Sequence, residues 1–409
     1  MRGGRAAVVG AGIVGLSVAW FLQEEGFDVT VVDSRGVAGG ASAGNAGWIT
    51  PGLVSPLAEP GVLGYALRSI VRRDSPLRLA PSALPANARF LSSFALHCTQ
   101  VKWSRGVQSL AGICALAFRS YDRLERGGVT APVRPAPILM AFTGAAEAAP
   151  VTHELRATAG DYRVSEFSQR ELRAECPLLS DRARHGLRLE GQRYVQPLEY
   201  TRSLAESFQS RGGQVSLGTS VDRVEPVSGG RLSVTAAGAA TSFDTVVLAS
   251  GAWLSRLGRS AGVRAPLAAG RGYSFTVKTE RTLSVPLYLP SLRVACTPAP
   301  EGMRVAGTME FRSADAPVDR RRIDAIVRSA TGLFEGVDWS SSSDPWVGPR
   351  PVTADGLPLI GATKHKGLYA AGGHGMWGMT LGPATGQLLA EYITTGERPD
   401  ALRPLDPCR

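Results

Sequence analysis

Lysine is scarce in this chain of 409 residues, which contains only Lys102, Lys278, Lys364 and Lys366. Its formal net charge of +10 therefore comes mainly from arginines, and these are scattered along the sequence. No run combines basic residues with interleaved aromatic ones, as surfaces that bind nucleic acid commonly do. We therefore expect no nucleic-acid partner, while weak association with an anionic membrane surface stays open.

Cysteine is also sparse, and its spacing carries no recognisable site. The five cysteines are an odd number, widely spaced, without a CxxC or Cys/His metal pattern: Cys98, Cys114, Cys176, Cys296 and Cys408. This spacing argues against a disulfide framework and predicts no metal site. It fits a reducing compartment, and we expect a cytoplasmic protein.

Long apolar runs and low-complexity segments are missing as well. Only the N-terminal stretch MRGGRAAVVGAGIVGLSVAWFL could pass for a signal peptide, and its glycines argue against that interpretation. No segment approaches the roughly 20 apolar residues that span a bilayer. The length and a hydrophobic content of 44% instead predict a globular chain with two intertwined domains.

The first 33 residues carry the strongest motif. Residues 5–33 alternate as strand, tight turn, helix and strand, with the pattern GxGxxG at Gly10, Gly12 and Gly15 and an acid, Asp33, at the end of the second strand. In the dinucleotide-binding fingerprint, the glycines allow a tight turn, close approach of a pyrophosphate and close helix packing. The helix N-terminus attracts the phosphates, and Asp33 would accept hydrogen bonds from ribose hydroxyls.

The segment after Asp33 bears on the choice between NAD and FAD. Residues 36–61 are rich in Gly, Ala, Ser and Pro and include AGGASAGNAGW. Small side chains suit a backbone that lies flat against an extended cofactor, although the same composition is also typical of a flexible loop. NAD-dependent enzymes usually continue with further βα units at this point, so the segment favours FAD.

A second GxGxxG pattern occurs at Gly373, Gly375 and Gly378, again between a strand and a helix. It would fit a second dinucleotide site, such as one for NADPH. The helix that follows runs close to the C-terminus and leaves no room for the strand that carries a ribose-binding acid. We therefore interpret it as a helix N-terminus that faces the N1 and O2 edge of a reduced flavin.

The rest of the chain alternates between helical and strand patterns. Residues 62–127 are mostly helical in pattern, and further helices are predicted at 198–211, 320–333 and about 381–393. Strands are predicted at 138–142 and 194–195, in a hairpin-rich region after residue 213, and as antiparallel strands between residues 267 and 311.

These motifs together resemble the D-amino acid dehydrogenase group of the FAD-dependent D-amino acid oxidase and glycine oxidase family. The ordered set spans the chain: VVGAGIVGLSVAWFL, GNAGWITPG, RGYSFTV, VAGTMEF, WVGPRPVTADGLPLIG and GGHGMWGMTLGPATGQLLAE. The resemblance implies an α/β fold, with a Rossmann-like FAD-binding domain built from discontinuous segments and a substrate domain with an antiparallel sheet and covering helices. We expect the FAD-binding domain at 1–60, 195–255 and 345–409, and the substrate domain at 61–194 and 256–344.

The resemblance also implies the residues that meet the substrate. Arg350 in GPRP matches the arginine that grips the substrate carboxylate, and a guanidinium suits that task because it donates two parallel hydrogen bonds. His374 matches a histidine that faces the flavin, and Met309 matches a methionine that faces the substrate. Tyr273 and Tyr288 are expected to line the pocket. Met376 and its neighbour Trp377 replace more polar residues of glycine oxidase, which puts the local flavin contacts in doubt.

The cofactor is expected to be FAD, bound without a covalent link. Relatives that attach the flavin do so through Cys or His, and the loop from Ala41 to Trp48 contains neither. The cofactor-binding residues implied by the motifs and the resemblance are Gly10, Gly12, Ile13, Val14, Gly15, Asp33, Ser34, Arg35, Ala41, Ser42, Asn45, Ala46, Gly47, Trp48, Val221, Ser250, Gly251, Trp253, Gly348, Gly375, Gly378, Met379 and Thr380.

The expected reaction is hydride transfer from the α-carbon of a small amino acid, either a D-amino acid or a proline-like imino acid, to flavin N5. The imine product then hydrolyses to a keto acid and ammonia, or remains cyclic when the substrate is proline-like. Two alternatives stay open: an oxygen-using oxidase of glycine or N-alkyl amino acids, and a noncatalytic flavin-binding subunit. The sequence does not identify the electron acceptor, which would be a quinone, a carrier or oxygen. Peripheral association with the inner face of the membrane and an accessory subunit also stay open.

Overall fold

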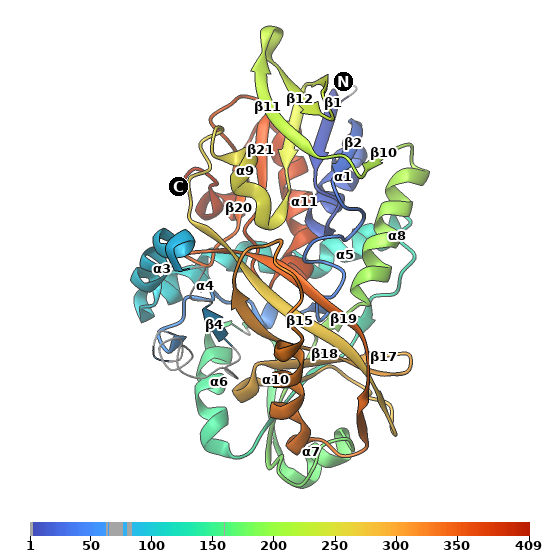
Figure 1. Cartoon of the computed structure of the whole chain (residues 1–409), viewed down its shortest axis with the longest axis vertical. Helices are drawn as coiled ribbons and strands as arrows, with labels where there is room; N and C mark the ends of the chain where they lie inside the picture. The colour runs from blue at the N-terminus through green and yellow to red at the C-terminus, as the bar shows by residue number, and fades with distance from the viewer. Residues whose placement is uncertain (1–2, 63, 65–76, 80–83, 159) are drawn as a thin grey trace.

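The computed structural model describes residues 3–62, 64, 77–79, 84–158 and 160–409. Its N-terminal unit comprises β1 (Arg5–Val9), α1 (Ile13–Glu24) and β2 (Asp28–Asp33). β1 is buried from Ala6 onward and pairs in parallel with β2. The predicted strand–turn–helix–strand unit is therefore present, and the mixed α/β fold class is confirmed (Figure 1).

A six-stranded sheet surrounds this unit in the order β10-β2-β1-β14-β21-β20. Every pair in it is parallel except β20 with β21. The sheet collects segments that are far apart in the sequence: β10 (Gln214–Leu217), β14 (Thr245–Leu248), β20 (Leu359–Ala362) and β21 (Leu368–Gly372). The carboxyl ends of its parallel strands meet at one edge, where open α/β sheets bind their ligands.

Helix α11 (Gly378–Thr395) packs beside α1 against the six-stranded sheet (Figure 1). The two helices approach so closely that a Cβ at Gly386 would lie 2.5 Å from the carbonyl carbon of Ser17. The core here is continuous, with the side chain of Trp20 fully buried. Further helices that surround this part of the molecule are α5 (Ala117–Arg126), α8 (Pro197–Ser210) and α9 (Leu254–Gly258).

A nine-stranded, mostly antiparallel sheet forms the other half of the molecule (Figure 1). Its strands are β19 (Val337–Thr353), β15 (Leu267–Thr279), β18 (Gly302–Phe311), β17 (Val294–Ala299), β16 (Leu287–Leu289), β6 (Ile138–Phe142), β8 (His185–Leu189), β7 (Val164–Ser168) and β4 (Leu77–Leu79). The predicted boundary at residue 345 falls inside β19, so this sheet extends into a segment that the sequence placed in the FAD-binding domain.

Helices cover this larger sheet. They are α3 (Leu84–His97), α6 (Ala145–Thr158), α7 (Gln169–Glu175) and α10 (Arg320–Ala330), whereas α4 (Gln100–Cys114) packs against α11 and the 3-10 turn Asp400–Leu405. The helical prediction for residues 62–127 holds for α3, α4 and α5, whereas residues 63, 65–76 and 80–83 lie outside the described part. The strand β4 inside this region was not predicted.

Two small sheets complete the fold. One is formed by β11 (Val221–Val227), β12 (Arg231–Ala236) and β13 (Ala239–Phe243), and the other by β3 (Trp48–Ile49), β9 (Arg193–Tyr194) and β5 (Arg134–Pro135). Across the described residues, no helix is long and apolar enough to cross a membrane.

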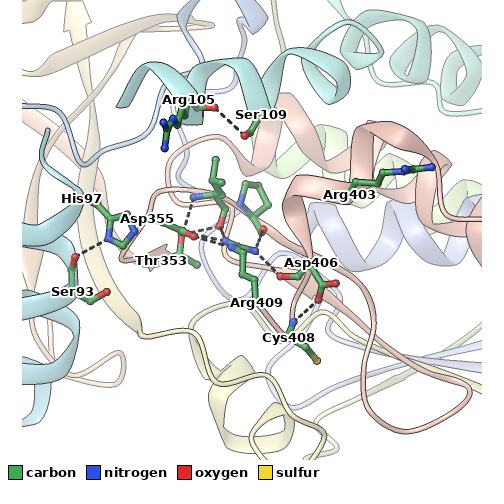
Figure 2. A network of polar contacts seen from close by, with 12 residues as sticks. Ser93, His97, Arg105, Ser109, Thr353, Asp355, Arg403, Asp406, Cys408 and Arg409 are labelled. Atoms are coloured by element: carbon green, nitrogen blue, oxygen red, sulfur yellow. Dashed lines mark hydrogen bonds and ion pairs between the residues drawn. The ribbon is translucent and has the colours of Figure 1, made fainter. Parts of the chain in front are cut away.

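The C-terminal residue is tied back onto the turn that follows β19. Arg409 donates to both carboxylate oxygens of Asp355, from Nε at 2.8 Å and from Nη2 at 3.0 Å (Figure 2). It also donates to the carbonyl oxygens of Pro358 and Leu357. On the side away from Arg409, the turn packs closely against Pro56, because a Cβ at Gly356 would lie 2.7 Å from Pro56 Cβ. The last residue thus fixes a turn close to the predicted substrate arginine.

Candidate active site

A cavity of about 320 Å³ opens at the carboxyl ends of β1 and β2, above the first glycine motif. Gly10 has a positive φ of 122°, and a Cβ there would lie 2.4 Å from the carbonyl oxygen of Ala249. A Cβ at Gly15 would lie only 1.9 Å from Gly10 O, so both positions require glycine. At the start of α1, Gly12 has no side chain to cap the helix, and the Ile13 amide donates to Ser42 Oγ at 3.1 Å, so backbone and one hydroxyl line this part of the cavity.

Asp33 lines this cavity and also fixes its shape. Its Oδ2 accepts a hydrogen bond from the Ala11 amide at 2.8 Å. Its Oδ1 accepts from the amides of Arg35 and Gly36 at 2.7 and 2.9 Å. The carboxylate therefore ties the glycine turn to the end of β2, in addition to the ribose contact that the sequence predicts.

Three side chains meet at the mouth of the same cavity. Arg35 forms an ion pair with Asp315, and its guanidinium carbon lies 4.3 Å from the ring centroid of Trp253. Trp253 Nε1 in turn donates to Asp315 Oδ2 at 3.2 Å. Asp315 comes from the segment between β18 and α10, whose carbonyls at Ala316 and Pro317 accept hydrogen bonds from a buried arginine. The larger sheet thus contributes to the wall of this cavity.

Most of the predicted cofactor residues lie together on this cavity. Those that line it are Gly10, Gly12, Ile13, Val14, Asp33, Ser34, Arg35, Ala41, Ser42, Asn45, Val221, Ser250, Gly251, Trp253, Gly375, Gly378 and Met379. The second glycine motif therefore contributes to the same cavity as the first, at the N-terminus of α11. One cavity reaches from Asp33 to two helix N-termini, which suits an extended dinucleotide.

The other predicted cofactor residues do not line this cavity, and several of them form close packing contacts or hydrogen bonds elsewhere. A Cβ at Gly47 would lie 2.1 Å from Val195 O, and a Cβ at Gly348 would lie 1.9 Å from the ring of Trp346. Thr380 accepts from the Thr50 amide and donates to Trp48 O, so it holds the strand that carries Trp48. Gly15, Gly47, Gly348 and Thr380 line neither this cavity nor its larger neighbour, whereas Ala46 and Trp48 line the larger one.

The larger cavity, of about 620 Å³, contains Arg350. Arg350 Nη1 donates to the carbonyl oxygen of Thr308 at 3.3 Å, and no carboxylate among the described residues lies within 4 Å of its nitrogens. Burial lowers the pKa of Arg350 to about 10, so the guanidinium stays cationic at neutral pH. The Arg350 side chain is half-buried and lines the cavity, so an anionic ligand there would supply the partner that the guanidinium lacks among the described residues.

Thr308 shapes the wall beside Arg350. It has a positive φ of 55°, which is unfavourable for a β-branched residue, at an irregularity in the pairing of β15 with β18. Strained backbone of this kind gathers at functional sites. No local pattern of residues predicts this conformation, because the strain arises from pairing between two distant strands.

The remaining predicted substrate residues separate into two groups. Met309 and Tyr288 line the larger cavity with Arg350. Tyr273 lines neither cavity, which differs from our expectation: its side chain is fully buried, and its hydroxyl donates to Glu310 Oε2 at 2.9 Å. A strand pattern of period two does not reveal which face meets the cavity, and the irregular pairing near Tyr273 shifts the alternation further.

His374 lies on the smaller cavity but is committed to a structural contact. Its Nε2 lies 2.9 Å from Thr385 Oγ1, and that hydroxyl donates to Leu381 O. Since the hydroxyl proton is used, Nε2 must be the donor in this pair. Burial lowers the pKa of His374 to about 3, so the ring is neutral near pH 7. The arrangement favours a role in fixing the start of α11 over one as a general acid or base.

The fold and the glycine-lined cavity define a dinucleotide-binding protein with a separate anion-attracting cavity beside the cofactor site. A family model described as FAD dependent oxidoreductase matches residues 5–392, and the chain belongs to this family. FAD is accordingly its cofactor, and the backbone-lined cavity fits such a group.

The relatives and solved structures agree with this assignment. The chain is 32% identical over 403 residues to a D-amino acid dehydrogenase of Cereibacter sphaeroides, covering 95% of this chain and 91% of that protein. It is 32% identical over 413 residues to a D-amino acid dehydrogenase of Rhizorhabdus wittichii, covering 97% of each. Its fold is similar to glycine oxidase from Geobacillus kaustophilus, with a TM-score of 0.74, 22% identity, and coverage of 100% of this chain and 99% of that one.

Proposed function

We propose that this chain oxidises the Cα–N bond of an amino acid, with a D-amino acid or a proline-like imino acid as substrate. The observation that carries the proposal is Arg350, a half-buried guanidinium that lines the larger cavity without a carboxylate partner among the described residues. A substrate carboxylate would supply the missing charge through two parallel hydrogen bonds. The names of the relatives support the choice of D-amino acids.

Each group of residues would have a separate task. Arg350 would fix the carboxylate and thereby the orientation of the α-carbon, while apolar side chains of the cavity exclude water. The residues that line the smaller cavity would hold FAD without a covalent link, and FAD would accept two electrons with the α-hydrogen as hydride. The neutral substrate amine supplies the electron pair as the hydride leaves, so no side chain needs to act as a base. Water then hydrolyses the imine of a D-amino acid to a keto acid and ammonia, whereas the imine of a proline-like substrate stays cyclic and releases no ammonia.

Anaerobic mixing of the holoenzyme with a panel of D-, L- and imino acids tests this proposal. We expect flavin absorbance near 450 nm to bleach with amino acids and to stay unchanged with the corresponding amino acid amides, which lack the carboxylate. Bleaching by no amino acid would overturn the proposal. Release of hydrogen peroxide in air would assign an oxidase, and its absence would indicate a dehydrogenase that passes electrons to a quinone or carrier.

A further inference from the structure

The larger cavity has a second polar region besides Arg350. This region, here called the distal cluster, consists of Glu59, Glu154, Tyr288 and Arg293, and all four line the cavity. The four residues interact, because the charges of Arg293, Glu154 and Glu59 each act on the pKa of Tyr288. The cavity is thus lined by two sets of polar residues, Arg350 and the distal cluster, together with apolar side chains.

Tyr288 is enclosed within this cluster but has no hydrogen-bond partner among the described residues. Its ring contacts Trp48 edge to face, with centroids 5.8 Å apart, so the phenol has a fixed position. Burial, with the nearby Glu154 and Glu59, raises its pKa to about 12 against the opposing effect of Arg293. Tyr288 is half-buried and lines the cavity, so its hydroxyl can exchange a hydrogen bond with a group there. A group within the cavity would supply this partner.

The distal cluster holds two carboxylates, Glu59 and Glu154, and one cation, Arg293. Glu59 forms an ion pair with Arg293, whereas no arginine, lysine or histidine of the described part forms an ion pair with Glu154. One oxygen of Glu154 accepts from Ser55 Oγ at 2.8 Å, and no described residue hydrogen-bonds the other. Burial and the charge of Glu59 raise the pKa of Glu154, against weaker effects of Ser55 and Arg293. A cation placed beside it would relieve this cost.

We propose that the substrate is an amino acid with a long side chain that ends in a cationic hydrogen-bond donor, and that Glu154 and Tyr288 bind this end. The inference rests on the proposed function, because Arg350 must hold the carboxylate at the other polar region. The lining of the cavity also includes the apolar side chains of Phe94, Trp103 and Met309, which suit a methylene stem. The cavity volume of about 620 Å³ far exceeds what glycine or alanine would fill.

Matched substrates test the inference on the unmodified holoenzyme. D-Arginine and D-citrulline have nearly the same shape, but only arginine carries the charge, and D-lysine and D-norleucine form a second pair. We expect kcat/KM for anaerobic flavin reduction to be roughly tenfold or more higher for the charged member of each pair, the size of a charged hydrogen bond. Equal or reversed values within both pairs would overturn the inference.

Variants of Glu154 and Tyr288 test whether these side chains cause the preference for the charged substrate. Glu154→Gln keeps the shape and the contact to Ser55 but removes the charge, so we expect it to raise KM for D-arginine at least about tenfold more than for D-citrulline. Tyr288→Phe should produce a smaller change in the same direction. The matched control is Glu147→Gln, also on α6, where Glu147 bonds Thr143 and Ser291 and does not line the cavity. We expect this control to keep the wild-type ratio between the two substrates.

The outcomes separate this inference from the proposed function. Bleaching by norleucine but not by lysine would keep amino acid oxidation and overturn the cationic side chain. Bleaching by no amino acid would overturn the proposed function. In that case, the change in flavin absorbance on binding D-arginine or D-citrulline still measures the cation preference. Equal affinity for the two ligands would then overturn the inference as well.

Discussion

The guanidinium of Arg350 lies directly over the backbone of Gly272, across the pairing of β19 with β15. A Cβ at Gly272 would lie 2.2 Å from Arg350 Cζ, a separation that no side chain tolerates. Gly272 is thus the position in RGYSFTV that leaves room for Arg350, the proposed carboxylate-binding arginine. The arginine keeps one hydrogen bond to the strand on the far side, to Thr308 O.

Gly272→Ala should therefore displace Arg350 while leaving the cofactor site intact. We expect KM for the amino acid to rise roughly tenfold or more, because the bidentate contact depends on the position of the guanidinium. FAD content, measured by absorbance per protein, should stay near wild type. Gly144→Ala is the matched control, since a Cβ there meets nothing within 4 Å. An unchanged KM in Gly272→Ala would show that Arg350 does not bind the substrate from its present position.

The effect of substituting Arg350 on KM should depend on the geometry of the new side chain as well as on its charge. Arg350→Lys keeps the charge and loses the two parallel hydrogen bonds, and Arg350→Ala loses both, so KM should rise in the order wild type, Lys, Ala. For Ala we expect a loss of about 3 kcal/mol in kcat/KM, with normal FAD content. Amides of the substrate should distinguish poorly between the variants. Wild-type kcat/KM in Arg350→Ala would place the carboxylate contact elsewhere.

The local parts of the fold were predictable from the sequence, and the long-range parts were not. The first βαβ unit and the strand Ile138–Phe142 appear where their residue patterns place them, because both patterns are local. The long strand β19 was not predicted, since Pro345 and a polar run interrupt its pattern. The strand tolerates them because β19 is an edge strand, where Pro needs no partner for a backbone N–H.

The residues of the candidate site divide in the same way, into those in short sequence motifs and those brought in by tertiary packing. The glycine motif and Arg350 are recognisable as short patterns, and the structure places them on two neighbouring cavities that share Asn45. Glu154 and Asp315 lie on these cavities without any motif around them, since their positions depend on how α6 and the segment after β18 pack. Side chains brought in by tertiary packing leave no periodic signal in one sequence.

The ion pair between Arg35 and Asp315 should slow the release of FAD. Both side chains are partly exposed, at 43% and 61%, so the pair contributes no more than about 1 kcal/mol. Asp315→Asn keeps an acceptor for Trp253 but removes the charge. We expect FAD to dissociate about threefold faster at low salt, with the difference vanishing at high salt. Asp324→Asn on α10, which makes the same change of charge away from the cavity, is the control. An equal rate at low salt would contradict this role.

The contact between Arg409 and Asp355 should make stability depend on pH in a defined direction. Burial disfavours the charged carboxylate of Asp355, but the Arg409 guanidinium and the Leu357 amide outweigh burial and lower its pKa. A carboxylate whose pKa is lowered in the folded state stabilises the protein above its unfolded pKa of about 3.9, and this stability is lost as the pH falls through the folded value.

Arg409→Gln should therefore lower the free energy of unfolding by about 1 to 3 kcal/mol at pH 7, since it weakens a charged contact that is largely buried. Urea unfolding at several pH values measures the difference from wild type. We expect the difference to be constant from pH 7 to about 5 and to shrink below the unfolded pKa of about 3.9. Arg403→Gln is the control, because Arg403 pairs with Asp400 at side-chain exposures of 72% and 89%. A difference that grows as the pH falls would show that the contact does not stabilise the charged form of Asp355.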